Sequence, residues 1–418
     1  MSKVHVIGAG LAGLAAALSL TKAGRAVIVH EAGAAGGGRC RSYFDREIGL
    51  RIDNGNHLLL SGNTAARAYI AETGAAGRFH IPDQAVFPFL DIKSGERWTV
   101  HPNSGRIPWW MFVPHRRVPG TRLADYLDLI KLVRCRDDTP VAESVRPGEL
   151  FRRLVEPLAV AALNTSTAEG LARLLGAVVR ETLMQGGAAC RPMLPKQGLS
   201  EALVEPAIAT LRTRGAEIRF NSRIAELTIA RGTVAGLRGP AGSIALEAAD
   251  AVVLAVPPWV AGELLPGLVV PDAFEAILNI HYRHAADKLR EPGLIGLISG
   301  AAEWVFVKPG HVSVTISAAN RMVDESADAI ALRVWPDVVD ALGLDAALKA
   351  AMPPYRVVKE RRATFAATAA QDARRPRSGT KTAANLALAG DWTNTGLPAT
   401  IEGAIRSGRL AADVILSA

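Results

Sequence analysis

Hydrophobic and polar positions at the start of the chain predict a strand, a helix and a second strand in close succession. Residues 4–7 form a short apolar run, an apolar helical stretch extends to about Lys22, and residues 26–30 form a second apolar run. Similar runs recur far downstream at residues 250–256 and 386–389. Uninterrupted apolar runs of this length are typical of strands buried on both faces of a parallel sheet. The pattern therefore predicts an α/β fold whose parallel sheet is assembled from distant parts of the chain.

Glycines punctuate the first strand-to-helix turn in the arrangement G-x-G-x-x-G. Gly8 permits a tight turn, Gly10 lets the backbone approach a pyrophosphate, and Gly13 allows the helix to pack closely on the strand. Leu11 and Ala12 begin the helix, whose N-terminal N–H groups favour an anion. The second strand runs into Glu31 and Ala32, about where an acidic residue binds the ribose of a dinucleotide. These residues predict a Rossmann-type site for an ADP moiety.

The next segments distinguish a flavin from a nicotinamide. Gly37-Gly38-Arg39 follows the acidic residue, and a stretch ending in Gly55-Asn56-His57 comes after it. This arrangement resembles the flavin-containing amine oxidase and phytoene desaturase superfamily. The resemblance implies that the first segment lies along the pyrophosphate of FAD and that the second passes the isoalloxazine ring. It also implies an inserted substrate domain.

The C-terminal segment carries further features that resemble this superfamily. An apolar strand ends in Gly390-Asp391, and we expect a helix to begin around Pro398, because proline suits a first helical turn. The resemblance implies that Gly390 and Asp391 contact the ribityl and pyrophosphate region. It places the backbone near Ile224 against the adenine, and the helix start against the pyrimidine end of the flavin. The residues at that helix start are Ala399, Thr400 and Ile401. No cysteine occurs in residues 390–400, so we expect non-covalent FAD.

The positions of these motifs predict a discontinuous two-domain chain. Residues 1–60, 195–260 and 380–418 form the expected FAD-binding domain, and residues 61–194 and 261–379 form the expected α+β substrate domain. A length of 418 residues and a hydrophobic fraction of 49% exclude a small binding module or a disordered chain. The net charge of +8 suits acidic partners, but an aromatic fraction of 5% argues against a nucleic-acid stacking platform.

Cysteine spacing and hydropathy indicate the compartment. Cys40, Cys135 and Cys190 are widely separated and show no metal-ligand spacing, so we expect no metal site and a reducing, cytoplasmic environment. No apolar run approaches the 18 to 20 residues, roughly, of a membrane span. Any membrane contact is therefore expected to be peripheral, on the inner face of the cytoplasmic membrane.

Within the superfamily, the chain is most similar to one branch. Amine oxidases commonly place an aromatic wall where this chain has Thr400, so an amine site is disfavoured. The chain instead resembles the hydroxysqualene dehydroxylase family of bacterial hopanoid biosynthesis. The similar segments are residues 53–60, 117–120, 123–132, 157–165 and 303–306. The family usually has Gln where Asn56 stands. The resemblance implies that FADH2 delivers hydride to an allylic carbon as its hydroxyl leaves, converting hydroxysqualene to squalene; the electron donor for FAD is unknown.

Candidates for the proton donor lie in two places. His57 lies on the flavin-facing stretch, although a histidine there more often bonds to backbone or cofactor. His281, Tyr282 and His284 form a second cluster in the substrate block, where a solvated surface is the simpler interpretation. Asp53 is expected to be a structural partner of the Gly55 turn.

A basic aromatic segment is a candidate for membrane contact and substrate admission. Trp109, Trp110 and Phe112 lie beside Arg116 and Arg117, a combination suited to an anionic lipid interface. The alternative is a pocket wall packed inside the substrate domain.

Three other functions remain open at this stage. A carotenoid or phytoene-type desaturase would run the redox chemistry in the opposite direction. An amine oxidase would release peroxide with amines. A non-catalytic FAD-binding partner or lipid carrier would bind flavin without turnover.

Overall fold

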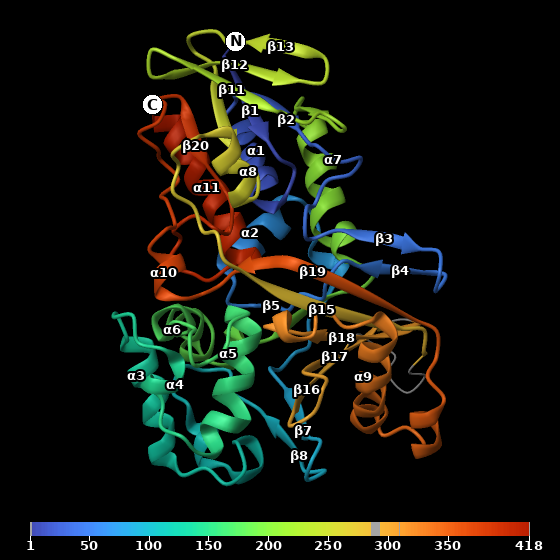
Figure 1. Ribbon diagram of the computed structural model, residues 1–418. Helices are drawn as coiled ribbons and strands as arrows, with labels where there is room; N and C mark the ends of the chain where they lie inside the picture. Colours follow the sequence, from blue (N-terminus) through green and yellow to red (C-terminus); the bar gives the residue numbers. More distant parts are fainter. Residues whose placement is uncertain (1, 286–292, 309, 418) are drawn as a thin grey trace.

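A parallel sheet of five strands, in the order β10-β2-β1-β14-β20, organises the upper part of the molecule in Figure 1. The computed structural model describes residues 2–285, 293–308 and 310–417. The strands are β1 (Lys3–Ile7), β2 (Ala26–His30), β10 (Glu217–Arg219), β14 (Ala251–Leu254) and β20 (Leu386–Leu388). Every neighbouring pair is parallel, so the prediction of an α/β fold with a Rossmann-type sheet is confirmed.

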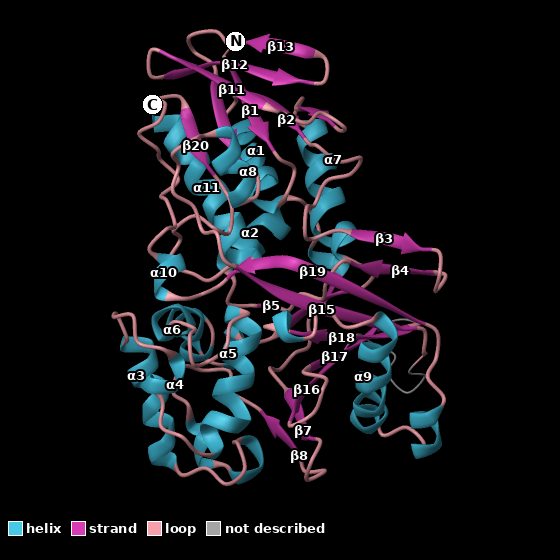
Figure 2. Ribbon diagram, in the orientation of Figure 1, coloured by secondary structure: helices cyan, strands magenta, loops and turns pink. Residues whose placement is uncertain are grey.

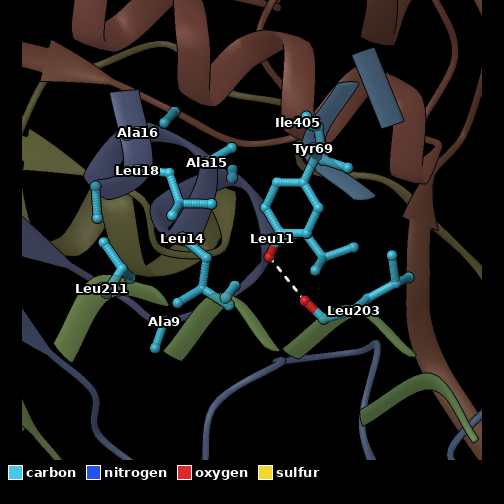
Figure 3. Close-up of a cluster of buried hydrophobic side chains, with 14 of the residues drawn as sticks. Ala9, Leu11, Leu14, Ala15, Ala16, Leu18, Tyr69, Leu203, Leu211 and Ile405 are labelled. Atoms are coloured by element: carbon cyan, nitrogen blue, oxygen red, sulfur yellow. Dashed lines mark hydrogen bonds between the residues drawn. The ribbon is translucent and has the colours of Figure 1, made fainter. Parts of the chain in front are cut away.

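Helices cover this sheet and supply its core. They are α1 (Leu11–Lys22), α2 (Thr64–Glu72), α7 (Glu205–Thr213), α8 (Pro258–Leu264) and α11 (Ile401–Ser417). The helices α1 and α11 pack so closely that a Cβ on Gly408 would lie 2.1 Å from the carbonyl oxygen of Ala12. Figure 3 shows the adjoining core, where Tyr69 of α2 donates its hydroxyl hydrogen to the carbonyl oxygen of Leu203 at 2.8 Å.

The start of α11 corrects one prediction. The sequence predicted a helix start around Pro398, but the helix begins three residues later, at Ile401. Thr400 explains the later start, because its hydroxyl oxygen accepts a hydrogen bond from the Gly403 N–H at 3.0 Å. A side-chain acceptor of this kind stabilises a helix N-terminus.

A second sheet of seven strands, in the order β19-β15-β18-β17-β16-β7-β8, forms the lower part of the molecule. Its strands are β7 (Phe87–Asp91), β8 (Arg97–Val100), β15 (Phe274–Tyr282), β16 (Gly293–Ile298), β17 (Trp304–Lys308), β18 (His311–Ile316) and β19 (Tyr355–Phe365). Neighbours are antiparallel except β16 and β7. The helix α9 (Ala327–Leu342) packs its buried side chains against one face.

A helical layer lies beside this sheet, as Figure 2 shows at lower left. It contains α3 (Leu127–Arg134), α4 (Val141–Ser144), α5 (Glu156–Leu163) and α6 (Ala172–Glu181), and α10 (Ala369–Asp372) lies near it. Trp304 of β17 contacts the core of this layer, so the layer and the sheet share an apolar boundary.

Small sheets complete the fold. They comprise the hairpin β3 (Ser42–Asp45) and β4 (Leu50–Asp53), the trio β5 (Leu59–Leu60), β6 (Phe79–His80) and β9 (Pro192–Pro195), and the meander β11 (Glu226–Ala230), β12 (Thr233–Gly239) and β13 (Gly242–Ala245).

The predicted domain division can be compared with the packing. All strands of the parallel sheet fall in residues 1–60, 195–260 and 380–418, and all strands of the seven-stranded sheet fall outside them. The segment with α2, however, packs with the parallel sheet, because Glu402 of α11 accepts hydrogen bonds from the N–H groups of Ala65 and Ala66 at 2.9 and 2.8 Å. A boundary near residue 80 therefore describes the packing better than one at 60.

Candidate functional site

The turn between β1 and α1 is shaped by glycines in two different ways. Gly8 has φ of +108°, and a Cβ there would lie 2.4 Å from the Ala255 carbonyl oxygen; a Cβ on Gly13 would lie 1.9 Å from the Gly8 carbonyl oxygen. A Cβ on Gly10, in contrast, would meet no described atom within 4 Å. Gly8 and Gly13 are thus required by the fold, whereas Gly10 leaves space beside the N-terminus of α1, where Leu11 and Ala12 begin the helix. This cradle fits the pyrophosphate of a dinucleotide.

The acidic residue at the end of β2 borders the same turn. The Glu31 carboxylate accepts hydrogen bonds from the N–H groups of Ala9 and Gly33, both at 2.8 Å. The Ser222 N–H bonds to the Glu31 carbonyl oxygen at 2.7 Å, and Ile224 is buried nearby against the parallel sheet. Glu31, the exposed Ala32 and the segment of Ile224 therefore lie on one side of the cradle, as a ribose and adenine site requires.

The glycine-arginine segment joins the two ends of the chain at this turn. The Gly37 N–H donates to the Ala9 carbonyl oxygen at 2.8 Å, and Gly38 approaches Gly10. The Arg39 guanidinium forms an ion pair with Asp391 at 2.6 Å. Arg39 also donates to the Ala363 carbonyl oxygen. The structure thus brings the first turn and the Gly37–Arg39 segment together with Asp391, which lies 352 residues after Arg39 in the sequence.

Gly390 connects this ion pair to α11. It has φ of +153°, and its N–H donates to the Ser407 hydroxyl oxygen at 2.9 Å. A Cβ at this position would lie 2.3 Å from the indole nitrogen of Trp392, so the Gly390-Asp391 turn requires glycine. Ala399 and Thr400 are partly accessible just before α11, where the family resemblance implies the pyrimidine end of the flavin.

The stretch of Gly55 and Asn56 lies against polar side chains of the seven-stranded sheet. The Asn56 side-chain amide donates to the hydroxyl oxygens of Ser313 and Thr315 at 2.7 and 3.0 Å. Its backbone N–H donates to the Asn279 side-chain oxygen at 3.2 Å, and a Cβ on Gly55 would lie 3.1 Å from the Asn279 amide nitrogen. The two parts of the molecule therefore meet at the segment expected to pass the flavin.

Sequence reasoning missed Asn279, Ser313 and Thr315 as parts of this contact. A signal was present on β18, where Ser313, Thr315 and the following Ser317 alternate with Val312, Val314 and Ile316. The apolar residues pack in the core beside α9, while the hydroxyl residues are also buried. Strict alternation with both faces buried indicates a polar network on one face of a strand.

A cavity opens beside His57. Its lining consists of Asp53, Asn56, His57, Leu194, Pro195, Leu199, Gly293, Phe306, Val307 and Lys308. An adjoining apolar cluster contains Leu58, Phe87, Leu194, Leu294, Trp304 and Phe306. The cavity is small, about 10 Å³, and it has an apolar wall of Leu194, Leu199 and Phe306 and a polar wall that includes Asp53 and Lys308.

A buried ion pair forms part of the cavity wall. The Lys308 ammonium lies 2.7 Å from the Asp53 carboxylate, which also accepts hydrogen bonds from the Ser42 hydroxyl and the Leu199 N–H. Burial opposes ionisation, but the Lys308 charge and these hydrogen bonds hold the pKa of Asp53 below its usual value. Asp53 thus links β4, β17 and the segment before α7, a wider role than the structural partner of the Gly55 turn that the sequence predicted.

The histidines near the cavity are held neutral. Burial lowers the pKa of His57 to about 4 and that of His281 to about 3, with the Lys308 charge adding to the effect on His281. His281 also shares a hydrogen bond of 2.9 Å with the Ser313 hydroxyl. Neither imidazole carries a proton to spare near neutral pH, so both are weak candidates for a general acid.

The expected cluster of His281, Tyr282 and His284 is not formed. Successive side chains of a strand point to opposite faces, and Tyr282 lies on the α9 side, where its hydroxyl donates to the Ala331 carbonyl oxygen at 2.7 Å. The rings of Tyr282 and His284 both contact Trp335. The prediction that these three residues form one cluster is therefore wrong, and Tyr282 and His284 are not in the cavity lining.

The basic aromatic segment is divided between core and surface. Trp110 is 1% exposed and packs edge-on against Tyr126, with ring centroids 5.5 Å apart, which contradicts its predicted membrane contact. Trp109 and Phe112 are 48% and 68% exposed. The Arg116 guanidinium lies 4.7 Å from the centre of the Trp109 ring. Arg117 is partly buried and donates to the Met111 carbonyl oxygen at 3.3 Å.

The described part of the chain contains neither a metal-binding cluster nor a membrane-spanning helix. In residues 2–285, 293–308 and 310–417, no group of three or more histidines, cysteines or carboxylates is arranged to hold a metal ion. Over the same ranges, no helix has both the length and the apolar composition needed to span a bilayer.

Comparisons with known proteins agree with this geometry. The family described as "Flavin containing amine oxidoreductase" matches residues 11–287 and 306–416. A protein named hydroxysqualene dehydroxylase from Rhodopseudomonas palustris is 49% identical over 421 residues, covering 100% of this chain and 99% of that protein. One of the same name from Sinorhizobium fredii is 47% identical, covering 99% and 98%. Among solved structures, a putrescine oxidase has a TM-score of 0.72 at 15% identity, covering 100% of this chain and 99% of that one, which shows a shared fold.

Proposed function

The chain belongs to the family of flavin-containing amine oxidoreductases, and from this membership we propose that it is an FAD-dependent enzyme that removes the hydroxyl group of hydroxysqualene to give squalene. Sequence identities of 49% and 47% over nearly the full length of two proteins named hydroxysqualene dehydroxylase support this substrate. The structural observation that carries the proposal is the apolar cluster of Leu194, Leu294 and Phe306, which adjoins the small cavity beside His57 where the flavin-facing stretch meets the second sheet.

The residues that would hold FAD form one continuous line. Gly10, Gly38 and the N-terminus of α1 would face the pyrophosphate, with Glu31 at the ribose and the backbone near Ile224 at the adenine. The stretch of Gly55 to His57 and the start of α11 would border the flavin ring. Reduced FAD supplies a hydride to an organic substrate when it is bound.

The cavity side chains have two tasks in this reaction. Leu194, Leu199 and Phe306 exclude water from an allylic centre on which positive charge develops as the hydroxyl leaves. His57 is neutral and can hydrogen-bond the substrate or the cofactor without adding a positive charge beside that centre. A long isoprenoid would extend from this point into the apolar cluster around Trp304.

A single-turnover experiment tests the function. The flavin of the purified protein is reduced without oxygen, hydroxysqualene is added, and flavin reoxidation is followed together with product mass. We expect one squalene per flavin reoxidised. Failure of the reduced protein to react would contradict the proposal.

A desaturase is the second candidate. A protein named probable zeta-carotene desaturase, from Synechococcus elongatus, is 25% identical over 250 residues, and the match covers 54% of this chain. Such an enzyme needs the same apolar cavity but uses oxidised flavin, so product analysis with the oxidised protein distinguishes it. Amine oxidation remains disfavoured by Thr400, and a non-catalytic flavoprotein would show no turnover in either test.

We also propose that the protein contacts anionic lipid through the surface formed by the 3₁₀ turn Trp109–Phe112, the turn Leu123–Tyr126 and α3, here called the apolar-basic surface. Leu123, Leu127 and Ile130 are exposed at helical spacing, and Trp109 and Phe112 are exposed on the neighbouring turn. Exposed basic residues on or directly beside these segments supply charge that complements anionic headgroups: Arg106, Arg122, Lys131 and Arg134. This surface would admit a substrate dissolved in the bilayer.

A further inference from the structure

Lys308 brings a charged side chain to the cavity beside His57. It is the last residue of β17, and it lines the cavity together with Asp53 and Phe306. Side chains two residues apart on a strand point to the same face, so Lys308 follows Phe306, whose ring belongs to the apolar cluster beside the cavity. The Lys308 ammonium lies 2.7 Å from the Asp53 carboxylate. This ion pair therefore joins the β17 wall of the cavity to the wall that contains Asp53.

Asp53 fixes the position of the ammonium. Its oxygen Oδ1 accepts hydrogen bonds from the Ser42 hydroxyl at 2.6 Å and from the Leu199 N–H at 2.8 Å, while Oδ2 accepts from Lys308 at 2.7 Å. A carboxylate held by three donors from different segments cannot turn freely. The ammonium is therefore held at one place in the cavity wall before any ligand binds.

The Lys308 ammonium retains hydrogens that a ligand can use. A lysine ammonium carries three N–H donors. Among residues 2–285, 293–308 and 310–417, the Asp53 oxygen Oδ2 is the one acceptor that bonds to it. The Lys308 side chain is only 11% exposed, so bulk water has little access to it. Because a buried donor without a partner costs free energy, the site favours a ligand atom that accepts a hydrogen bond.

Asn56 borders the same cavity and has an unused acceptor. Its amide nitrogen is bonded to the hydroxyl groups of Ser313 and Thr315. Its side-chain oxygen is buried and has no hydrogen-bond partner in the described part of the chain. A hydroxyl group both accepts and donates hydrogen bonds, so it matches Lys308 and Asn56 together. Neither a hydrocarbon nor a carboxylate matches both.

The size and charge of the cavity narrow the class of ligand. Its volume of about 10 Å³ gives room for about one water molecule, so it takes one small polar group and not a chain. An ammonium group there would meet the charge of Lys308, and a carboxylate or phosphate would meet that of Asp53. An uncharged hydroxyl avoids both repulsions. Its carbon chain would lie along the adjoining apolar cluster, which includes Leu294.

Resting on the proposed function, we propose that the Lys308 ammonium binds the hydroxyl oxygen of hydroxysqualene by donating a hydrogen bond to it. The carbon–oxygen bond is thereby held beside the flavin-facing stretch that contains Asn56 and His57. A charged donor forms a stronger hydrogen bond than a neutral one, and a bond to the departing oxygen assists its departure. Asp53 acts through Lys308 and is a positioning residue. A hydrocarbon substrate of a desaturase has no such oxygen, so this contact selects an alcohol.

The test measures how strongly the oxidised holoenzyme binds detergent-dispersed hydroxysqualene and squalene, from the change in flavin absorbance. Oxidised flavin carries no hydride, so neither ligand reacts. Squalene has hydrogen where hydroxysqualene has its hydroxyl, so the ratio of the two affinities isolates that group. We expect the wild type to bind hydroxysqualene about tenfold or more tightly than squalene, as a hydrogen bond from a charged donor provides. Lys308→Met should bind both ligands equally, with its affinity for squalene unchanged.

A second variant covers a loss of folding. Removing one partner of a buried ion pair leaves the other charge uncompensated, which is strongly destabilising. Lys308→Met combined with Asp53→Asn removes both charges and should show the same loss of preference. Lys349→Met is the matched control, because Lys349 forms an ion pair with Asp340 at 2.7 Å and does not line the cavity. It should keep the wild-type preference for hydroxysqualene.

The ratio of affinities separates this contact from a general structural effect, which would weaken the binding of both ligands alike. A wild type without preference for hydroxysqualene, or a Lys308→Met variant that keeps the preference, would overturn the role of Lys308. Single turnovers of the reduced wild type test the proposed function separately. If they form squalene while Lys308→Met keeps the preference, only the role of Lys308 fails. If they form none, the proposed function fails and this role fails with it.

Discussion

At the residue scale, the glycines of the first turn have two different roles, because one is required by the packing of the fold and another leaves space for a cofactor. The side of Gly13 is closed by the Gly8 carbonyl oxygen, so an added methyl group would force helix α1 away from the sheet. The side of Gly10 is open. A substitution at Gly10 therefore leaves the protein contacts intact and obstructs only the group that would occupy that space.

We expect the Gly10→Ala variant to bind flavin at least about tenfold more weakly than the wild type. The melting temperature of the flavin-free variant should equal that of the flavin-free wild type. Gly13→Ala should lower that melting temperature, because overpacking against backbone typically costs 1–3 kcal/mol, roughly. Flavin absorbance and calorimetry measure the two effects. Gly77→Ala is the control, since a Cβ there meets no described atom within 4 Å. Full flavin retention in Gly10→Ala would contradict the assigned cradle.

At the element scale, the apolar-basic surface depends on how two turns and one helix divide their side chains. The repeated apolar residues of 123–132 indicate an amphipathic helix, but they do not say which members face the core. In the structure, Tyr126, Leu129 and Leu132 are buried, while Leu127 and Ile130 are exposed. The exposed stripe is therefore available to a lipid surface.

We expect Trp109→Ala combined with Phe112→Ala to reduce binding to vesicles containing anionic phospholipid by at least about tenfold, because two exposed apolar side chains no longer enter the interface. Vesicle flotation measures the effect, and single turnovers with detergent-dispersed hydroxysqualene should stay unchanged. Phe44→Ala is a matched control, since Phe44 is 61% exposed on the separate β3–β4 hairpin. If the double variant floated with the vesicles as well as the wild type does, the proposed lipid contact would be refuted.

At the scale of the whole molecule, neutral histidines are buried in both sheets. His30 of β2 lies 3.0 Å from His5 and is 1% exposed, and burial lowers its pKa to about 4; His281 of β15 is 0% exposed. In the unfolded chain these groups bind a proton near pH 6.5, whereas in the folded protein they do so only well below it. Stability is therefore complete above pH 6.5 and falls as pH drops toward 4.

When the pH falls from 7 to 5, we expect the free energy of unfolding to decrease by about 2 kcal/mol for each of these two histidines, His30 and His281. Calorimetry of wild-type protein and His30→Asn tests this, because the variant should lose less stability over that range. His115→Gln replaces an exposed histidine and should follow the wild-type profile. A variant His30→Asn as acid-sensitive as the wild type would contradict the expectation.

The sequence by itself determined the features that depend on local backbone chemistry. The strand, glycine turn and helix at residues 3–22, the strand ending before Gly390, and the parallel sheet all follow from short apolar runs and from glycines where no side chain fits. These motifs also indicated FAD, because each can be recognised from a few consecutive residues.

Only the tertiary structure decided which side chains share a site. Asn279, Ser313 and Thr315 form hydrogen bonds with Asn56, more than 200 residues away in the sequence. Trp110 is buried while its neighbour Trp109 is exposed. The sequence grouped His281 with Tyr282, but the pleat of β15 directs them to opposite faces. Contacts of this kind depend on the register and packing of distant segments, which local patterns do not encode.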